Sequence, residues 1–178
     1  MSALVHCKKK LMKILGIDPG TVVMGYGLIE SDGSETALVD YGAITVPEKL
    51  KIGERLNYLY QELIKIIKQH RPDGCAVESP FVAKNVKSAM AIGRAQAIAL
   101  LAASSQHIPI HEYTPAQVKM RVANYGASSK EQVQEMVRLQ LGLKEAPEPN
   151  DAADALAVAL CHVQEMHLNE LLNGQGER

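Results

Sequence analysis

Residues 12–30 read MKILGIDPGTVVMGYGLIE, and this stretch decides the fold. An apolar run over residues 11–18 ends at an Asp-Pro-Gly turn signal, and a second apolar run covers residues 22–30. Both runs have the length of buried strands. A third strand is predicted over residues 37–46, where Pro47 ends it. The three strands together predict an antiparallel meander.

The rest of the chain alternates between helical and strand patterns. Helices are predicted over residues 50–70, 84–105, 115–123, 129–141 and 150–168. Two further strands are predicted over residues 75–78 and 108–113. This order predicts an α/β fold with a five-stranded mixed sheet, in which the meander leads into parallel strands and helices cover both faces.

Length and composition indicate a single globular domain. The 178 residues suffice for one core, and we expect that domain to span residues 12–168, between a flexible basic arm (1–11) and a disordered tail (169–178). The three cysteines form no CxxC pair, which predicts reduced thiols in a cytoplasmic protein. No stretch is expected to approach the ~18 apolar residues of a membrane span, and the order of charge and apolarity at the N-terminus is not that of a signal peptide.

The net charge of −1 conceals a local asymmetry. Between residues 81 and 130 the only acid is Glu112. The same stretch holds six basic residues, Lys84, Lys87, Arg94, Lys119, Arg121 and Lys130. A basic stretch in an otherwise acidic chain is typical of a nucleic-acid-binding surface. The alternative is a solvated basic face, which is the better interpretation of Lys87 or Arg121 taken singly.

Most acids in a globular protein lie on its surface, but four acids of this chain lie next to apolar segments. Asp18 and Glu78 each end an apolar strand, and Asp151 and Asp154 open an otherwise apolar helix, three positions apart and therefore on one face. Clustered carboxylates need a cation, and an all-oxygen site suits Mg²⁺ or Mn²⁺ rather than zinc. Two such ions can hold the attacking and leaving oxygens of a phosphodiester displacement. Each acid alone has an ordinary explanation, as a turn residue or a helix N-terminal acid; the four together favour a metal site.

Six short segments resemble one family, the RuvC-type Holliday-junction resolvases. They are ILGIDPGT (14–21), GYG (25–27), VESPF (77–81), AKN (83–85), QVK (117–119) and DAADALA (151–157). The likeness runs from about residue 12 to about residue 162, nearly the whole chain.

The resemblance implies a ribonuclease-H-like fold and a cytoplasmic homodimer that resolves four-way DNA junctions by paired symmetric nicks, in recombination and repair. It implies Mg²⁺ as cofactor, with two ions per active site and Mn²⁺ as a substitute, and a branch-migration motor of the RuvA–RuvB type as partner. The catalytic and metal-binding residues would be Asp18, Glu78, Asp151 and Asp154. Some members carry His at the position of Asp151, which makes that position the most tolerant.

The resemblance also assigns DNA contacts. Phe81 would stack on a base near the opened crossover, an interaction worth ~1–3 kcal/mol, although a lone Phe is more often a core residue. Lys84 belongs to the matching AKN segment, and Lys119 and Lys130 match positions near the scissile phosphate. We therefore predict that these four residues bind DNA.

One helical feature has two explanations. Ala89, Gly93 and Ala97 lie four apart and would let a second backbone approach closely. They could serve a two-fold dimer or close packing onto the sheet, and the spacing does not separate the two.

Three other functions share parts of this sequence pattern. A ribonuclease-H-like nuclease could act on RNA or on other branched substrates. An actin-like ATPase or sugar kinase shares the acid-x-Gly-Thr pattern but needs two such domains. A catalytically silent DNA-binding module would not require the four acids. His162 and His167 lie five apart on a helix and do not predict a metal site.

Overall fold

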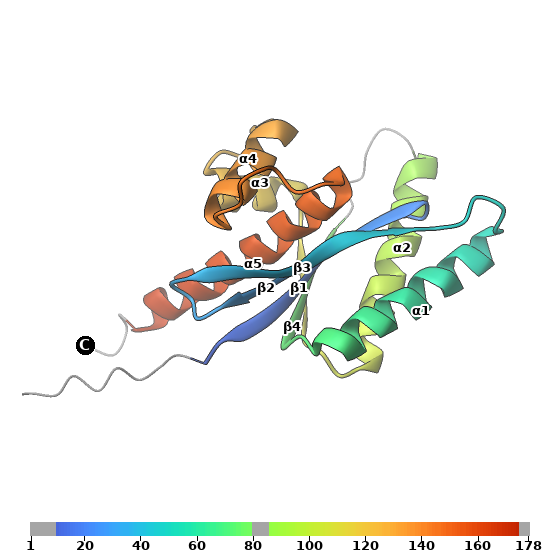
Figure 1. The fold of residues 1–178 in the computed structure, drawn as a ribbon, viewed down its shortest axis with the longest axis horizontal. Helices are drawn as coiled ribbons and strands as arrows, with labels where there is room; N and C mark the ends of the chain where they lie inside the picture. Colours follow the sequence, from blue (N-terminus) through green and yellow to red (C-terminus); the bar gives the residue numbers. More distant parts are fainter. Residues whose placement is uncertain (1–9, 80–85, 175–178) are drawn as a thin grey trace, which may run out of the picture.

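The computed structural model describes residues 10–79 and 86–174 (Figure 1). The five strands are β1 (Met12–Asp18), β2 (Val23–Ser31), β3 (Thr36–Thr45), β4 (Gly74–Glu78) and β5 (Ile110–Tyr113). They form one sheet in the order β3-β2-β1-β4-β5. β1 pairs antiparallel with β2 and parallel with β4, so the predicted mixed sheet is confirmed.

Helices cover both faces of the sheet, as predicted (Figure 1). They are α1 (Ile52–His70), α2 (Val86–Ser105), α3 (Pro115–Ala123), α4 (Lys130–Gln140) and α5 (Asn150–Gly174). α1 and α2 lie on one face. α5 lies along the other, with α3 and α4 packed on its outer side.

The sheet separates two apolar cores, one on each of its faces. The alternation of side chains along a strand decides which core each side chain enters. On β1, Leu15 and Ile17 pack in the core beneath α1 and α2, whereas Ile14 packs in the core beneath α5. Because side chains alternate along a strand, Asp18 shares the α5 face with Ile14. By the same rule Ala76, which packs in the α5 core, places Glu78 on that face.

α5 lies unusually close to the sheet because glycines line its path. A Cβ atom on Gly16 would lie 2.1 Å from the carbonyl oxygen of Ala155, and one on Gly25 would lie 1.9 Å from that of Asp151. No side chain fits at these distances. Gly25 is the β2 partner of Asp18, so this close approach brings the first turn of α5 next to the end of β1.

Two sequence expectations differ from the structure. The last helix does not end at residue 168 but continues to Gly174, because residues 169–173 contain neither glycine nor proline; the predicted tail is therefore helical over 169–174. α2 is also long and apolar enough, by length and composition alone, to span a membrane, with a mean hydropathy of 1.2 over 18 residues. The expectation that no stretch approaches this apolarity is corrected, because the alanines of α2 raise its mean.

Candidate active site

The four acids come together at one edge of the α5 face. β1 and β4 are parallel neighbours and pair Ile17 with Val77, so the next residues, Asp18 and Glu78, end the two strands side by side. α5 begins above this edge and supplies Asp151 and Asp154 from its first two turns. The structure thus places all four predicted acids in one region.

Three of these carboxyl groups, those of Asp18, Glu78 and Asp154, have raised pKa values. Burial raises the pKa of Asp18 to about 8, and repulsion from Glu78, Asp154 and Asp151 adds to the rise. Burial also raises the pKa of Glu78 to about 7, with repulsion from Asp154 as the next cause. The pKa of Asp154 is raised too, mainly by burial. Such shifts mark a site that favours a cation.

Two lysines supply positive charge at this edge. The Nζ atom of Lys130 lies 2.6 Å from Oδ2 of Asp154, and this hydrogen bond raises the pKa of Lys130. Lys130 and Lys119 both act to lower the pKa of Glu78, against the larger effect of burial. A cavity of about 200 Å³ is lined by the two lysines together with Glu78 and Asp154. Val118 and Val133 also line it.

Capping residues fix the two helices that carry these lysines. The hydroxyl of Thr114 accepts the N–H of Gln117 at 3.3 Å at the start of α3, and Pro115 is the first helical residue, as predicted. Ser129 caps α4 in the same way. Lys130 is therefore held in the first turn of α4, opposite Asp154.

The donor set fits a hard divalent cation. The four carboxylates offer only oxygen. Burial and repulsion make the ionised forms of Asp18, Glu78 and Asp154 costly unless a cation is present. Within residues 10–79 and 86–174, no three Asp, Glu, His or Cys side chains already converge on one point as ligands would. Lys130, paired with Asp154, supplies a positive charge in this arrangement.

Two of the predicted DNA-binding residues, Phe81 and Lys84, lie outside the described residues. Sequence reasoning also missed two groups of polar contacts. The Tyr113 hydroxyl is 2.7 Å from Nδ1 of the buried His162, which links β5 to α5. Ser79 and Glu112 contact each other beside Glu78; the isolation of Glu112 in a basic stretch was a signal that could have pointed to it.

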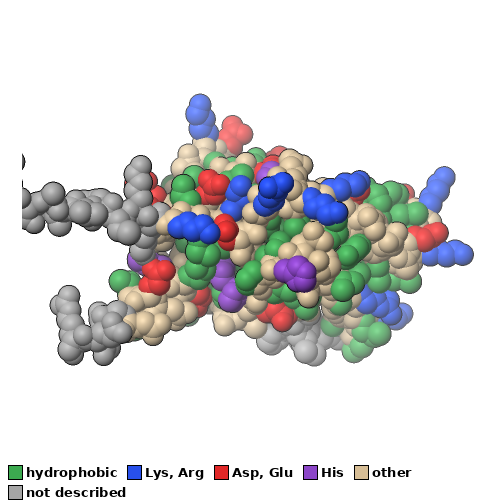
Figure 2. All heavy atoms as spheres, turned by 90° about the horizontal axis from the view of Figure 1, so that it is seen from below, with side chains coloured by type: hydrophobic (Ala, Val, Ile, Leu, Met, Phe, Trp, Pro, Cys, Tyr) green, Lys and Arg blue, Asp and Glu red, His purple; other side chains and the backbone are tan. Residues whose placement is uncertain are grey.

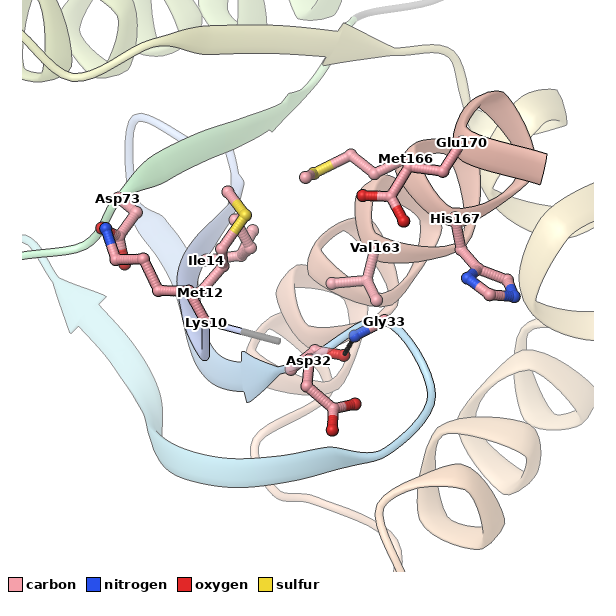
Figure 3. A pocket seen from close by; sticks show the side chains of 11 residues that line it. Lys10, Met12, Ile14, Asp32, Gly33, Asp73, Val163, Met166, His167 and Glu170 are labelled. Atoms are coloured by element: carbon pink, nitrogen blue, oxygen red, sulfur yellow. Dashed lines mark hydrogen bonds and ion pairs between the residues drawn. The ribbon is translucent and has the colours of Figure 1, made fainter. Parts of the chain in front are cut away.

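A second cavity lies at the opposite end of the sheet from the four acids. A cavity of about 280 Å³ opens at the start of β1 between Met12, Val163 and His167 (Figure 3), six residues or ~20 Å along the strand from Asp18. None of the four acids lines it. Among the residues drawn in colour, the face in Figure 2 carries both acidic and basic side chains.

Comparison with known proteins gives the same family along nearly the whole chain. The family model described as crossover junction endodeoxyribonuclease RuvC matches residues 14–162. A protein of that name from Dehalococcoides mccartyi is 54% identical over 166 residues, which cover 93% of this chain and 99% of the relative. Another, from Chloroflexus aggregans, is 52% identical over 151 residues, with coverage of 85% and 92%.

A solved structure extends the similarity to three dimensions. The RuvC of Thermus thermophilus, determined in complex with a Holliday junction substrate, is similar with a TM-score of 0.84 at 34% identity. The match covers 89% of this chain and 96% of that one.

Proposed function

The chain belongs to the RuvC family of crossover junction endodeoxyribonucleases, and on this premise we propose that it resolves four-way DNA junctions by paired symmetric nicks. Its ribonuclease-H-like fold is that of the family. The observation that carries the proposal is the cluster of Asp18, Glu78, Asp151 and Asp154, of which the first two have pKa values raised to about 8 and about 7.

We propose that these four acids are the catalytic residues and hold Mg²⁺, two ions per site, with Mn²⁺ able to substitute. The bound metal would activate water and stabilise the charge that develops on the phosphate. The side chains of this chain would orient the ions from three elements, β1, β4 and α5. Asp154 would exchange its contact with Lys130 for the metal.

The lysines would then serve the DNA. Lys119 and Lys130 border the cavity beside Glu78 and Asp154, where a cationic group can position a phosphate next to the acids. We extend the proposal to Phe81 and Lys84, on the strength of the family resemblance: Phe81 as a base-stacking residue at the crossover and Lys84 as a DNA contact.

We also propose a homodimer formed through α2, since paired nicks require two active sites. Val86, Met90 and Leu101 on this helix are 70%, 54% and 55% exposed. A Cβ atom on Gly93 would meet no described atom within 4 Å, so Gly93 does not serve packing onto the sheet. The helix instead buries Ala95, Ala99, Ala102 and Ala103 against the domain. A second copy would cover this exposed apolar side.

Family membership further supports two proposals that no described residue carries, a cytoplasmic location and cooperation with a branch-migration motor of the RuvA–RuvB type. Co-purification of the tagged protein with the motor subunits on junction DNA would test the second.

Cleavage of a synthetic four-way junction tests the main proposal. The protein should produce nicks at matching positions in two opposing strands with Mg²⁺ and none with EDTA, as read on a denaturing gel. A flap and an RNA–DNA hybrid are the comparison substrates. Faster cleavage of the hybrid than of the junction would favour the rival nuclease, and cleavage of neither would refute the assignment.

A further inference from the structure

Three polar side chains from different elements meet directly behind Glu78. Ser79, the residue that follows Glu78, donates from its Oγ to Oε2 of Glu112 on β5 at 3.1 Å. Gln96 of α2 donates from its Nε2 to Oγ of Ser79 at 3.0 Å and also to Oε2 of Glu112. We call these three residues the Ser79 cluster.

The Ser79 cluster lies on the opposite face of the sheet from the acids. β4 and β5 pair Val77 with Glu112 and Glu78 with Tyr113. Tyr113 packs in the core beneath α5, so Glu78 points to that face and Glu112 points to the face of α1 and α2. Gln96 reaches the cluster from α2, as this alternation requires.

Backbone pairing connects the Ser79 cluster to Glu78. The N–H of Ser79 donates to the carbonyl oxygen of Tyr113 at 2.8 Å, which extends the ladder one residue past Glu78. On the other face, the Tyr113 hydroxyl meets His162 of α5 at 2.7 Å. The strand end that carries Glu78 is thus attached to α2 on one side and, through its pairing partner on β5, to α5 on the other.

The negative charge of Glu112 is unusual in this part of the sequence. It is the single acid among residues 81–130, a stretch with six basic residues. A carboxylate in such a stretch opposes phosphate binding. A carboxylate is also a strong acceptor that can receive two hydrogen bonds at once, and the one observed here receives them from Ser79 and Gln96.

We propose that Ser79, Gln96 and Glu112 are positioning residues that fix Glu78 for the reaction. This inference rests on the proposed function. Because a displacement of about 1 Å in a catalytic group can cost two orders of magnitude in rate, the loss of one hydrogen bond in the cluster should reduce the chemical step while binding and folding persist.

The experiment compares Ser79→Ala, Glu112→Ala, their double variant and Glu112→Gln with the wild type. Glu112→Gln keeps an oxygen acceptor and removes the charge, and Glu62→Ala, on α1 in an exposed pair with Lys65, is the control. Measured are the single-turnover nicking rate at saturating enzyme, the junction affinity without Mg²⁺, and the melting temperature.

Both alanine variants should nick about tenfold more slowly or worse, with affinity and melting temperature close to those of the wild type. The double variant should lose less than the product of the two single losses, because both substitutions remove the hydrogen bond between Ser79 and Glu112. Glu112→Gln should recover most of the rate. Rates within twofold of the wild type, losses that follow the melting temperature, or multiplicative losses in the double variant would each overturn the inference.

Hydrogen exchange separates this inference from the proposed function. In the DNA-free protein, the amide of Ser79 should exchange faster in Glu112→Ala than in Glu112→Gln. A wild-type protein that nicks no junction would refute the proposed function. Independently of that result, an unchanged exchange rate of the Ser79 amide in Glu112→Ala would refute the proposal that the Ser79 cluster fixes the end of β4.

Discussion

Replacing Asp18 by Asn should stabilise the metal-free protein at alkaline pH. Burial and repulsion from the neighbouring acids raise the pKa of Asp18 from 3.8 to about 8 in the folded state. The folded protein therefore holds this proton more tightly than the unfolded chain does. Stability is lost as the pH rises from about 4 to about 8, because the unfolded chain ionises first. Asn cannot ionise and escapes this loss.

The size of the effect follows from the shift. A change from 3.8 to about 8, at 1.36 kcal/mol per pKa unit, sets an upper limit of about 6 kcal/mol. Relaxation and water entry at the edge of the sheet reduce the penalty of ionising a partly buried group. We expect roughly half of the limit, about 3 kcal/mol, which for a domain of this size corresponds to a rise of about 6–12 °C in melting temperature.

The assay is thermal unfolding in EDTA at about pH 5 and about pH 9, where the difference between Asp18→Asn and the wild type should grow with pH. Asp32→Asn is the matched control. Hydrogen bonds from the backbone of Glu35 and Ser34 lower the pKa of Asp32 to about 2, so its effect should not vary over this range. A pH-independent difference for Asp18→Asn would refute the reasoning. Added Mg²⁺ should make the wild type more stable than Asp18→Asn, since only the wild type keeps all four acids.

The other predictions concern cleavage and packing. Glu78→Gln should abolish nicking and preserve junction binding, as measured on a denaturing gel and by mobility shift; near-normal cleavage would exclude Glu78 from the site. Lys119→Ala and Lys130→Ala should each weaken junction binding and lower the slope of log affinity against log salt by about 0.9; unchanged slopes would make both lysines solvated surface residues. Gly25→Ala should lower the melting temperature and slow nicking together, because its Cβ would lie 1.9 Å from the Asp151 carbonyl oxygen; wild-type values for both would show that α5 can shift without consequence.

The sequence alone predicts most of the secondary structure, because hydrophobic period, turn residues and caps are local signals. The predicted order of five strands and five helices is found, and the Thr114 cap lies at the predicted residue. The four acids are recognisable for a related reason: a carboxylate that ends a buried strand or opens an apolar helix is out of place in a local pattern. The end of α5 was misplaced because polar residues after Leu168 resemble a tail, although nothing there stops a helix before Gly174.

Contacts between residues far apart in the sequence depended on the tertiary structure. The pattern left open whether the side of α2 with Gly93 faces the sheet, and packing decided that it does not. The pairing of Lys130 with Asp154 and the meeting of Ser79, Gln96 and Glu112 join elements whose separation no local period encodes. The raised pKa of Asp18 depends on how closely α5 approaches the sheet over Gly16 and Gly25. Burial and charge–charge repulsion act through space, so they exist only once the chain has brought these groups together.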